Sequence, residues 1–234
     1  MNNLDNFFDY LLSMDIKRDL KLTKEYPNYR EIIKSYKVKL QQSKLEPIIT
    51  LGSLKGQIYT LPFDLIGGST FELKINIELL NLLLENKTEL NKFSDSDYNK
   101  EFRIKVNNCD EDSMDMLFSK DFLSRIVYED QVDKEYAKKC VNSEEAVICG
   151  DFTGLSTNQV PFFILDGNHK AYGKVKAGKD DIRGVLVGRN IWIKALMTEE
   201  DKMFIKIFNN INFILSYRNG RILKCDLNKY MYNI

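Results

Sequence analysis

The N-terminal part of the chain carries apolar residues at helical spacing. Residues 3–13 and 29–45 each place an apolar side chain at every third or fourth position, so that each segment has one apolar face. Pro27 separates the two segments. The pattern predicts two amphipathic helices that cover a sheet, with docking of a partner as the alternative role.

Beyond residue 46 the pattern changes to short apolar runs and to alternation, which are both typical of strands. Residues 71–77 alternate most clearly, with polar side chains on one face and apolar side chains on the other. A β-hairpin is expected between residues 47–51 and 57–61. The other expected strands cover residues 101–106, 146–152, 162–165 and 182–187.

Helical patterns return in three later segments, which are residues 79–84, the end of 128–140, and 198–215. The last of these is the strongest prediction, because Thr198 stands at a capping position and three acidic residues follow it. We expect this helix to pack on the sheet. Residues 221–234 are predicted to form a short, strand-like tail.

Two segments suggest ligand binding by composition. Gly67-Gly-Ser-Thr70 resembles a phosphate cradle but lacks the spacing of a P-loop, so a plain turn is favoured. Asp110 to Asp115 is rich in acidic residues but does not fit the calcium loop of an EF-hand. We expect those acids to occupy the first turn of a helix that continues to Phe122.

Polar residues dominate positions 87–100, which are predicted to be a surface loop and the best internal boundary. The predicted organisation is a helical extension over residues 1–46, followed by one α/β domain over residues 47–234. The domain is of the α+β kind, with a small mixed sheet.

Composition bounds the function only loosely. Lysine and arginine together number 34, as do aspartate and glutamate, and this balance argues against a dedicated nucleic-acid binder. The four cysteines form no metal-binding pair, and a single histidine cannot complete a common zinc site. No signal peptide and no apolar run of roughly 18–20 residues is present, so we expect a cytoplasmic protein with no membrane contact.

The stretch from Pro161 to Tyr172 contains the only histidine, His169. Residues 162–165 predict a buried strand, which we expect to pair antiparallel with residues 146–152. Gly167 allows a sharp turn, because glycine adopts backbone angles that other residues avoid. From Asn168 the residues favour a helix that ends near Gly178.

This joint has the chemistry of an anion site. The first turn of a helix has unpaired N–H groups and a partial positive charge, and both attract phosphate. His169 and Lys170 add donors and positive charge at the same end. Asp166 is a carboxylate that can orient a proton, hold His169 in one tautomer or help to bind a metal. The alternative is a structural turn that binds no ligand.

Residues 164–171, Ile-Leu-Asp-Gly-Asn-His-Lys-Ala, resemble the Asp-Gly-x-His-Arg motif of the ParB/sulfiredoxin superfamily. The resemblance covers about residues 145–188. It implies an α/β core in which Gly167, Asn168, His169 and Lys170 hold the phosphates of ATP or CTP together with Mg²⁺. Members of the superfamily include CTP-binding partition proteins, an ATP-dependent sulfinic-acid reductase, free-serine kinases and proposed nucleases.

Three departures from the family pattern limit which activities of the superfamily we expect in this protein. Sulfiredoxins have a cysteine directly before the histidine, where this chain has Asn168, so that activity is not expected. Lys170 replaces the usual arginine, which keeps the charge but loses the bidentate geometry. The helix-turn-helix that follows this domain in partition proteins is not evident here.

Three functions are consistent with these observations. The first is a phosphotransferase or nucleotide hydrolase in which Asp166 or His169 assists proton transfer. The second is a non-catalytic regulatory module that binds a protein partner or, with less support, DNA. The third and weakest is a nuclease. A second catalytic carboxylate is not marked by any motif, and four acidic residues remain unranked candidates: Asp64, Glu72, Glu78 and Asp151.

Overall fold

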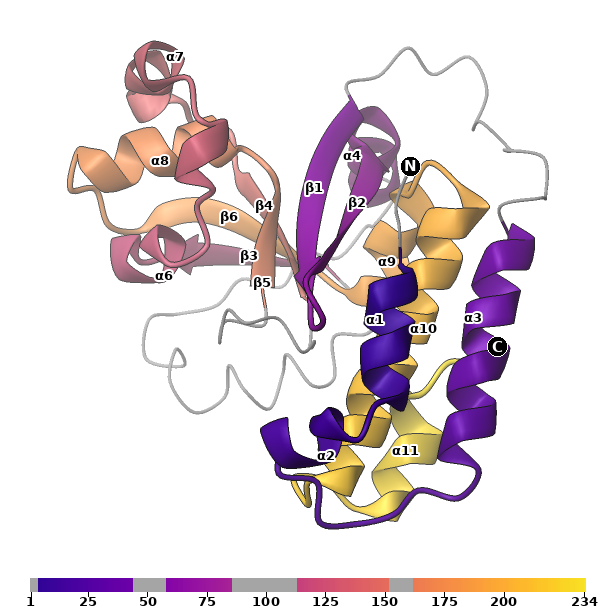
Figure 1. The fold of residues 1–234 in the computed structure, drawn as a ribbon. Coiled ribbons are helices and arrows are strands. Elements are labelled where there is room, and N and C mark those ends of the chain that lie inside the picture. The colour runs from indigo at the N-terminus through magenta and orange to yellow at the C-terminus, as the bar shows by residue number, and fades with distance from the viewer. Residues whose placement is uncertain (1–3, 44–57, 86–112, 152–161) are drawn as a thin grey trace.

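The computed structural model describes residues 4–43, 58–85, 113–151 and 162–234. Within these ranges the chain forms a mixed α/β fold with one sheet of two strands and one sheet of four (Figure 1). This confirms the predicted fold class. None of the helices in the described ranges is long and apolar enough to cross a bilayer.

The four-stranded sheet has the strand order β3-β6-β4-β5. Its central strands β4 and β6 are parallel, whereas β3 pairs antiparallel with β6 and β5 pairs antiparallel with β4. The predicted antiparallel pairing of the strand at 146–152 with the strand at 162–165 is therefore confirmed. The strands are β3 (Ser113–Phe118), β4 (Val147–Asp151), β5 (Phe162–Asp166) and β6 (Ile182–Val187).

Alternation along β4 and β5 sends side chains into two different cores, because successive strand residues point to opposite faces of a sheet. Cys149 and Ile164 belong to a smaller cluster that also contains Ala171 of α8 (Asn168–Lys176). Ile148 and Leu165 belong to a larger cluster shared with the two-stranded hairpin. Both faces of these strands are buried, which explains why their sequences are continuously apolar.

The hairpin pairs β1 (Ile58–Leu65) with β2 (Ser69–Asn76) through a turn at Gly67 and Gly68. Both glycines have positive φ angles, of 85° and 76°. A residue with a side chain would be strained in this backbone conformation. The predicted strand near residues 71–77 and the predicted turn are confirmed. Residues 58–61, expected to pair with residues 47–51, pair with β2, and residues 47–57 lie outside the described part of the chain.

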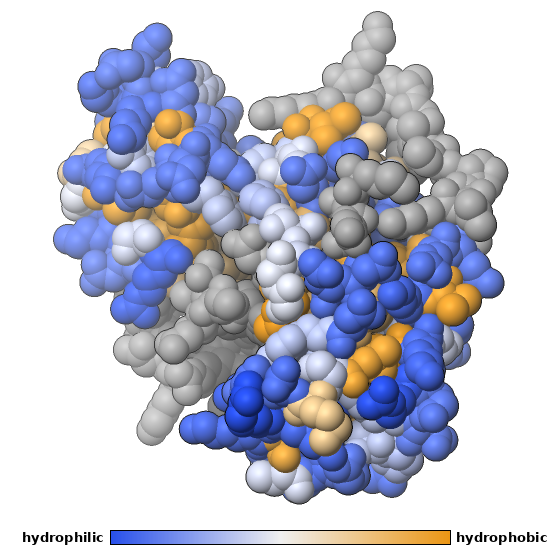
Figure 2. Space-filling view, in the orientation of Figure 1, coloured by the Kyte–Doolittle hydropathy of each residue, from blue (hydrophilic) through white to orange (hydrophobic). Residues whose placement is uncertain are grey.

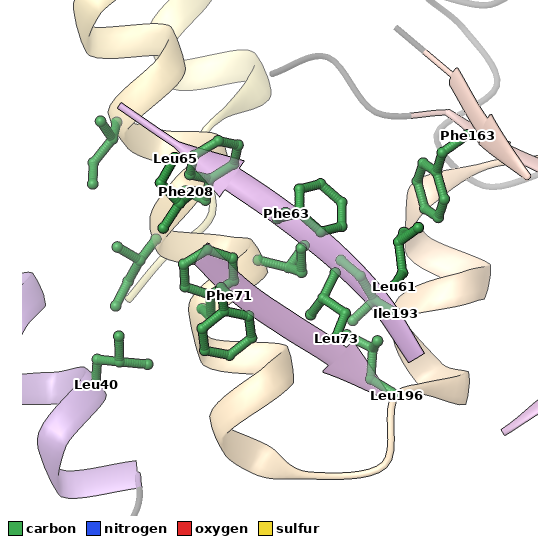
Figure 3. Close-up of a cluster of buried hydrophobic side chains, with 14 of the residues drawn as sticks. Leu40, Leu61, Phe63, Leu65, Phe71, Leu73, Phe163, Ile193, Leu196 and Phe208 are labelled. Carbon is green, nitrogen blue, oxygen red and sulfur yellow. The ribbon is translucent and has the colours of Figure 1, made fainter. Parts of the chain in front are cut away.

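The hairpin packs against α10 (Glu199–Arg218) through aromatic side chains (Figure 3). Phe71 stacks on Phe204 with ring centroids 3.8 Å apart, and Phe63 meets Phe208 edge-on. The long helix predicted from Thr198 is therefore confirmed, as is its packing on a sheet. The sheet in question is the hairpin.

The N-terminal helices join this same core. α1 (Asp5–Leu12) and α3 (Tyr29–Ser43) confirm the two predicted amphipathic helices, and a short α2 (Asp15–Asp19) lies between them. Apolar side chains of α1 and α3 belong to one cluster with β1, β2 and α10. The core therefore joins the beginning of the chain to its C-terminal third.

Two expectations were wrong. The helix predicted through Phe122 is strand β3 over residues 113–118, because its buried side chains alternate and the strand finds a partner in β6. Only a short helix, α6 (Lys120–Ser124), follows it. The strand-like tail is instead α11 (Lys224–Tyr230), whose start is capped when Asp226 accepts a hydrogen bond from the N–H of Leu223.

The remaining predicted helices are confirmed at the ends of their segments. α4 (Ile77–Glu85) covers residues 79–84, and α7 (Lys134–Lys139) ends the segment 128–140. Two expected features, the polar loop at 87–100 and the strand at 101–106, lie outside the described residues. Three short helical turns and α9 complete the fold: η2 (Glu129–Gln131), η3 (Cys140–Asn142), α9 (Arg189–Trp192) and η4 (Ile193–Ala195).

Candidate functional site

The strand-to-helix joint has the predicted form. β5 ends at Asp166, Gly167 takes a left-handed conformation with φ of 88°, and α8 begins at Asn168. A Cβ atom on Gly167 would lie 3.0 Å from Cε of Lys170 and 3.3 Å from Cα of Val147. Glycine is therefore required at this position both for the backbone angle and for the close approach of β4.

Asp166 is committed to the turn itself. One of its carboxylate oxygens accepts a hydrogen bond of 2.7 Å from the N–H of Gly167. A carboxylate at this position puts negative charge beside the start of α8, where it is stabilised by the helix dipole. Any anion that binds here must be placed on the side of the turn away from Asp166, or must bring a cation with it.

Asn168 has a structural side chain. Its amide oxygen accepts a hydrogen bond of 3.0 Å from the N–H of Tyr128, and its amide nitrogen donates one of 3.0 Å to the carbonyl of Tyr128. The residue is buried. The predicted contribution of Asn168 to phosphate binding is therefore restricted to its backbone N–H.

His169 is half-buried and lies against α7. Its ring meets the ring of Tyr136 edge-on, with centroids 5.3 Å apart. Asp133 caps α7 by accepting hydrogen bonds from the N–H groups of Glu135 and Tyr136. The backbone hydrogen bond from Tyr136 is the main cause that lowers the pKa of Asp133, and the nearby His169 contributes to the same shift. The Asp133 carboxylate therefore lies on the α7 side of His169.

Lys170 reaches from α8 to the start of β4. Its ammonium lies 3.0 Å from a carboxylate oxygen of Glu145, and this contact lowers the pKa of the glutamate. The two partners differ in exposure, since the lysine side chain is 13% exposed and the glutamate side chain 79%. Glu145 is free to swing into solvent, so Lys170 can exchange it for another anion without moving its own buried stem.

These residues line one pocket with a volume of about 520 Å³. The pocket lies between α8 with η3 on one side and the hairpin on the other, where Figure 2 shows the surface hollowed beside the polar lobe that carries α7 and α8. Its volume is in the range of small-molecule sites. The polar lining comes from Tyr59, Gln131, Tyr136, Lys139, Cys140, Ser143, Glu145, Asp166, Gly167, Asn168, His169 and Lys170, and the apolar lining from Ile77, Ile164 and Leu165.

All five predicted site residues, Asp166 to Lys170, line this pocket. Sequence reasoning missed other lining residues, which include Tyr59, Gln131, Tyr136, Lys139 and Glu145. No local motif marks these residues, because they reach the pocket through tertiary packing from separate elements. Glu145 adds a second carboxylate to the lining beside Asp166, and it was not among the four acidic candidates.

None of the four acidic residues left unranked by the sequence is among the described residues of the pocket wall. Glu72 and Glu78 are exposed on β2 and α4. Asp151 is buried, with its carboxylate 3.6 Å from the guanidinium of Arg189. The side chain of Asp64 lies outside the described part of the structure. The described residues hold no group of three potential metal ligands.

Comparisons with known proteins give no relative for this chain. No protein-family model matches it, and neither a curated protein nor a solved structure matches it significantly. The similarity of residues 164–171 to the ParB/sulfiredoxin motif therefore stays a prediction.

Proposed function

We propose that this protein binds the phosphate groups of a nucleotide at the start of α8, as the resemblance to the ParB/sulfiredoxin superfamily implies. The observation that carries the proposal is the composition of the first helical turn. Gly167 supplies no side-chain cap, and the turn contains no acidic residue but does contain His169 and Lys170. These residues line a pocket large enough for a nucleotide.

Each residue at the turn has a separate role in this proposal. The backbone N–H groups of Asn168 and His169 donate to phosphate oxygens. Lys170 leaves Glu145 and neutralises phosphate charge, and Lys139 adds a second positive charge on the wall formed by α7. His169 donates a further hydrogen bond from a ring N–H.

The proposal includes Mg²⁺ as a companion of the nucleotide. Mg²⁺ is commonly held by one or two carboxylates and by the phosphates of its substrate, and it does not require a group of three protein ligands. Asp166 is the carboxylate in position to meet such an ion at the turn. Its negative charge, which disfavours a bare phosphate, then favours the magnesium complex.

A calorimetric and thermal-shift series with ATP, ADP, CTP and GTP, each with Mg²⁺, tests this proposal. We expect one nucleotide to bind, and a concentration of 100 times its Kd to stabilise the fold by about 2.7 kcal/mol. The double variant His169→Ala and Lys170→Ala should weaken that binding at least about 50-fold, because two charge-assisted hydrogen bonds are lost.

Lys176→Ala is the matched control. Lys176 lies on the same helix and is also paired with a glutamate, Glu129, at 3.1 Å, but it stands at the far end of α8 from the pocket. Its removal should leave the affinity unchanged. Absence of binding by all four nucleotides, or an equal loss in the control, would mean that the joint is a structural turn.

Turnover separates the two leading functional classes. In a phosphotransferase or hydrolase, Asp166 or His169 would accept the proton of the attacking hydroxyl or water. Phosphate release with the bound nucleotide, lost in His169→Ala while binding of the nucleotide is retained, would support an enzyme. Binding without release or transfer would support a regulatory module.

A further inference from the structure

The pocket has two unlike walls. The wall on α8 is polar and carries the phosphate chemistry proposed above. The rest of the lining, the second wall, comes from Tyr59 of β1 and Ile77 at the start of α4 on the hairpin side, and from Gln131 of η2 and Tyr136 of α7. A bare phosphate fills only a small part of about 520 Å³, so the second wall is available for the rest of a larger ligand.

The second wall is aromatic at two positions. Burial is the main cause that raises the pKa of Tyr59, and the neighbouring Tyr128 and Asp166 add to the shift, so its phenol stays neutral. Tyr136 is 54% exposed although it lines the pocket, and its edge-on packing against His169 leaves ring surface uncovered. Exposed aromatic surface in a pocket favours a flat, unsaturated ring.

A polar side chain of the lining is bonded to one of these aromatic residues. The hydroxyl of Tyr59 donates a hydrogen bond of 3.0 Å to the side-chain oxygen of Gln131. This bond fixes the amide, and it leaves the N–H groups of Gln131 available for an acceptor on the edge of a bound ring. A fixed amide beside aromatic surface is a suitable arrangement for recognising a nucleobase.

We infer that Tyr59, Gln131 and Tyr136 form a base-binding subsite, so that the ligand is a nucleoside phosphate held at both ends. Tyr136 stacks on the base, Gln131 donates to its edge, and α8 binds its phosphates. This inference rests on the proposed function. It adds that three residues outside the resembling segment select for a ring.

The test compares three ligands on the full chain by calorimetry: the nucleotide that binds best, its nucleoside, and inorganic tripolyphosphate. We expect the nucleotide to bind about tenfold or more tightly than tripolyphosphate, because stacking adds to the phosphate contacts. Tyr136→Ala should weaken nucleotide binding about tenfold and should change tripolyphosphate binding less than twofold. Gln131→Ala should also weaken the binding of the nucleotide more than the binding of tripolyphosphate.

Two variants complete the design. Tyr136→Phe keeps the ring and should bind the nucleotide as the native protein does. Tyr172→Ala removes a tyrosine of α8 that does not line the pocket, and it should have no effect on either ligand.

The outcomes distinguish this inference from the proposed function. Equal affinity for nucleotide and tripolyphosphate, or an equal loss of both in Tyr136→Ala, would overturn the base-binding subsite while the phosphate site stands. Binding of the nucleoside alone, abolished by Tyr136→Ala, would support the subsite even if tripolyphosphate fails to bind. Failure of all three ligands would overturn both proposals.

Discussion

Two helices of this protein, α8 and α10, begin in opposite ways. At the start of α10, the hydroxyl of Thr198 accepts a hydrogen bond of 3.0 Å from the N–H of Asp201, and the first turn contains three acidic residues. At the start of α8, Gly167 offers no side chain, and the first turn carries His169 and Lys170 with no acid.

The start of α10 is built for stability of the helix, whereas the start of α8 is open to a ligand. The N–H groups and the dipole of α10 are largely satisfied by its own residues, so nothing at that end attracts a ligand. The first turn of α8 has two basic residues and no acid of its own, although Asp166 flanks it, and the pocket lies against it. An uncapped helix start is less stable than a capped one, and a bound anion would supply the missing interaction.

The largest expected effect comes from giving α8 the chemistry of α10. His169→Glu places an acid in the first turn, where it should repel phosphate and weaken nucleotide binding about 100-fold. The same change should alter the free energy of unfolding by less than about 1 kcal/mol, because repulsion from Asp133 and Asp166 offsets the benefit of an acid at a helix N-terminus. Calorimetry and urea denaturation measure the two quantities. His169→Gln adds no negative charge and should lose far less affinity. If His169→Glu binds the nucleotide as well as the native protein does, the phosphates bind at another place.

The reverse change removes the cap of α10. Thr198→Ala should lower the free energy of unfolding by about 1 kcal/mol, because the N–H of Asp201 loses its acceptor. Nucleotide affinity should not change, since α10 contributes no residue to the described pocket wall. Thr198→Ser keeps the hydroxyl and serves as the control. A loss of affinity with unchanged stability would show that the two helix starts are coupled.

The smallest effect concerns the acid that competes for Lys170. Glu145→Gln should raise nucleotide affinity about two- to fivefold at low salt, and the gain should shrink as salt screens the charges. Glu129→Gln frees Lys176 at the other end of α8 and is the matched control. Equal gains in both variants would indicate a general effect of net charge and not a contact at the pocket.

Sequence patterns predicted the fold where local signals agree with tertiary packing. The start of α10 and the joint at Gly167 have capping or turn residues that specify the backbone directly, and both were placed correctly. Strand β3 was missed because its acids suggested a helix start. The alternation of buried side chains leads to a strand because β6 pairs with this segment, and that pairing is not visible in the local sequence.

The candidate site divides in the same way. The five residues from Asp166 to Lys170 are contiguous, so one motif marks them all. Tyr59, Gln131 and Tyr136 are brought to the pocket from three separate elements, and no spacing in the sequence links them. Asn168 shows the limit of motif reasoning, because its side chain belongs to the motif but is used to hold Tyr128.

The pairing of Asn168 with Tyr128 also gives the pocket its own reporter of opening. Tyr128 lies outside the helices and strands, and its amide hydrogen is held by the side chain of a residue forty positions later. Slow hydrogen exchange at this amide therefore requires that α8 stays docked against the segment that leads into η2. The exchange rate of this backbone proton reports the free energy of separating α8 from that segment, where that opening costs less than global unfolding.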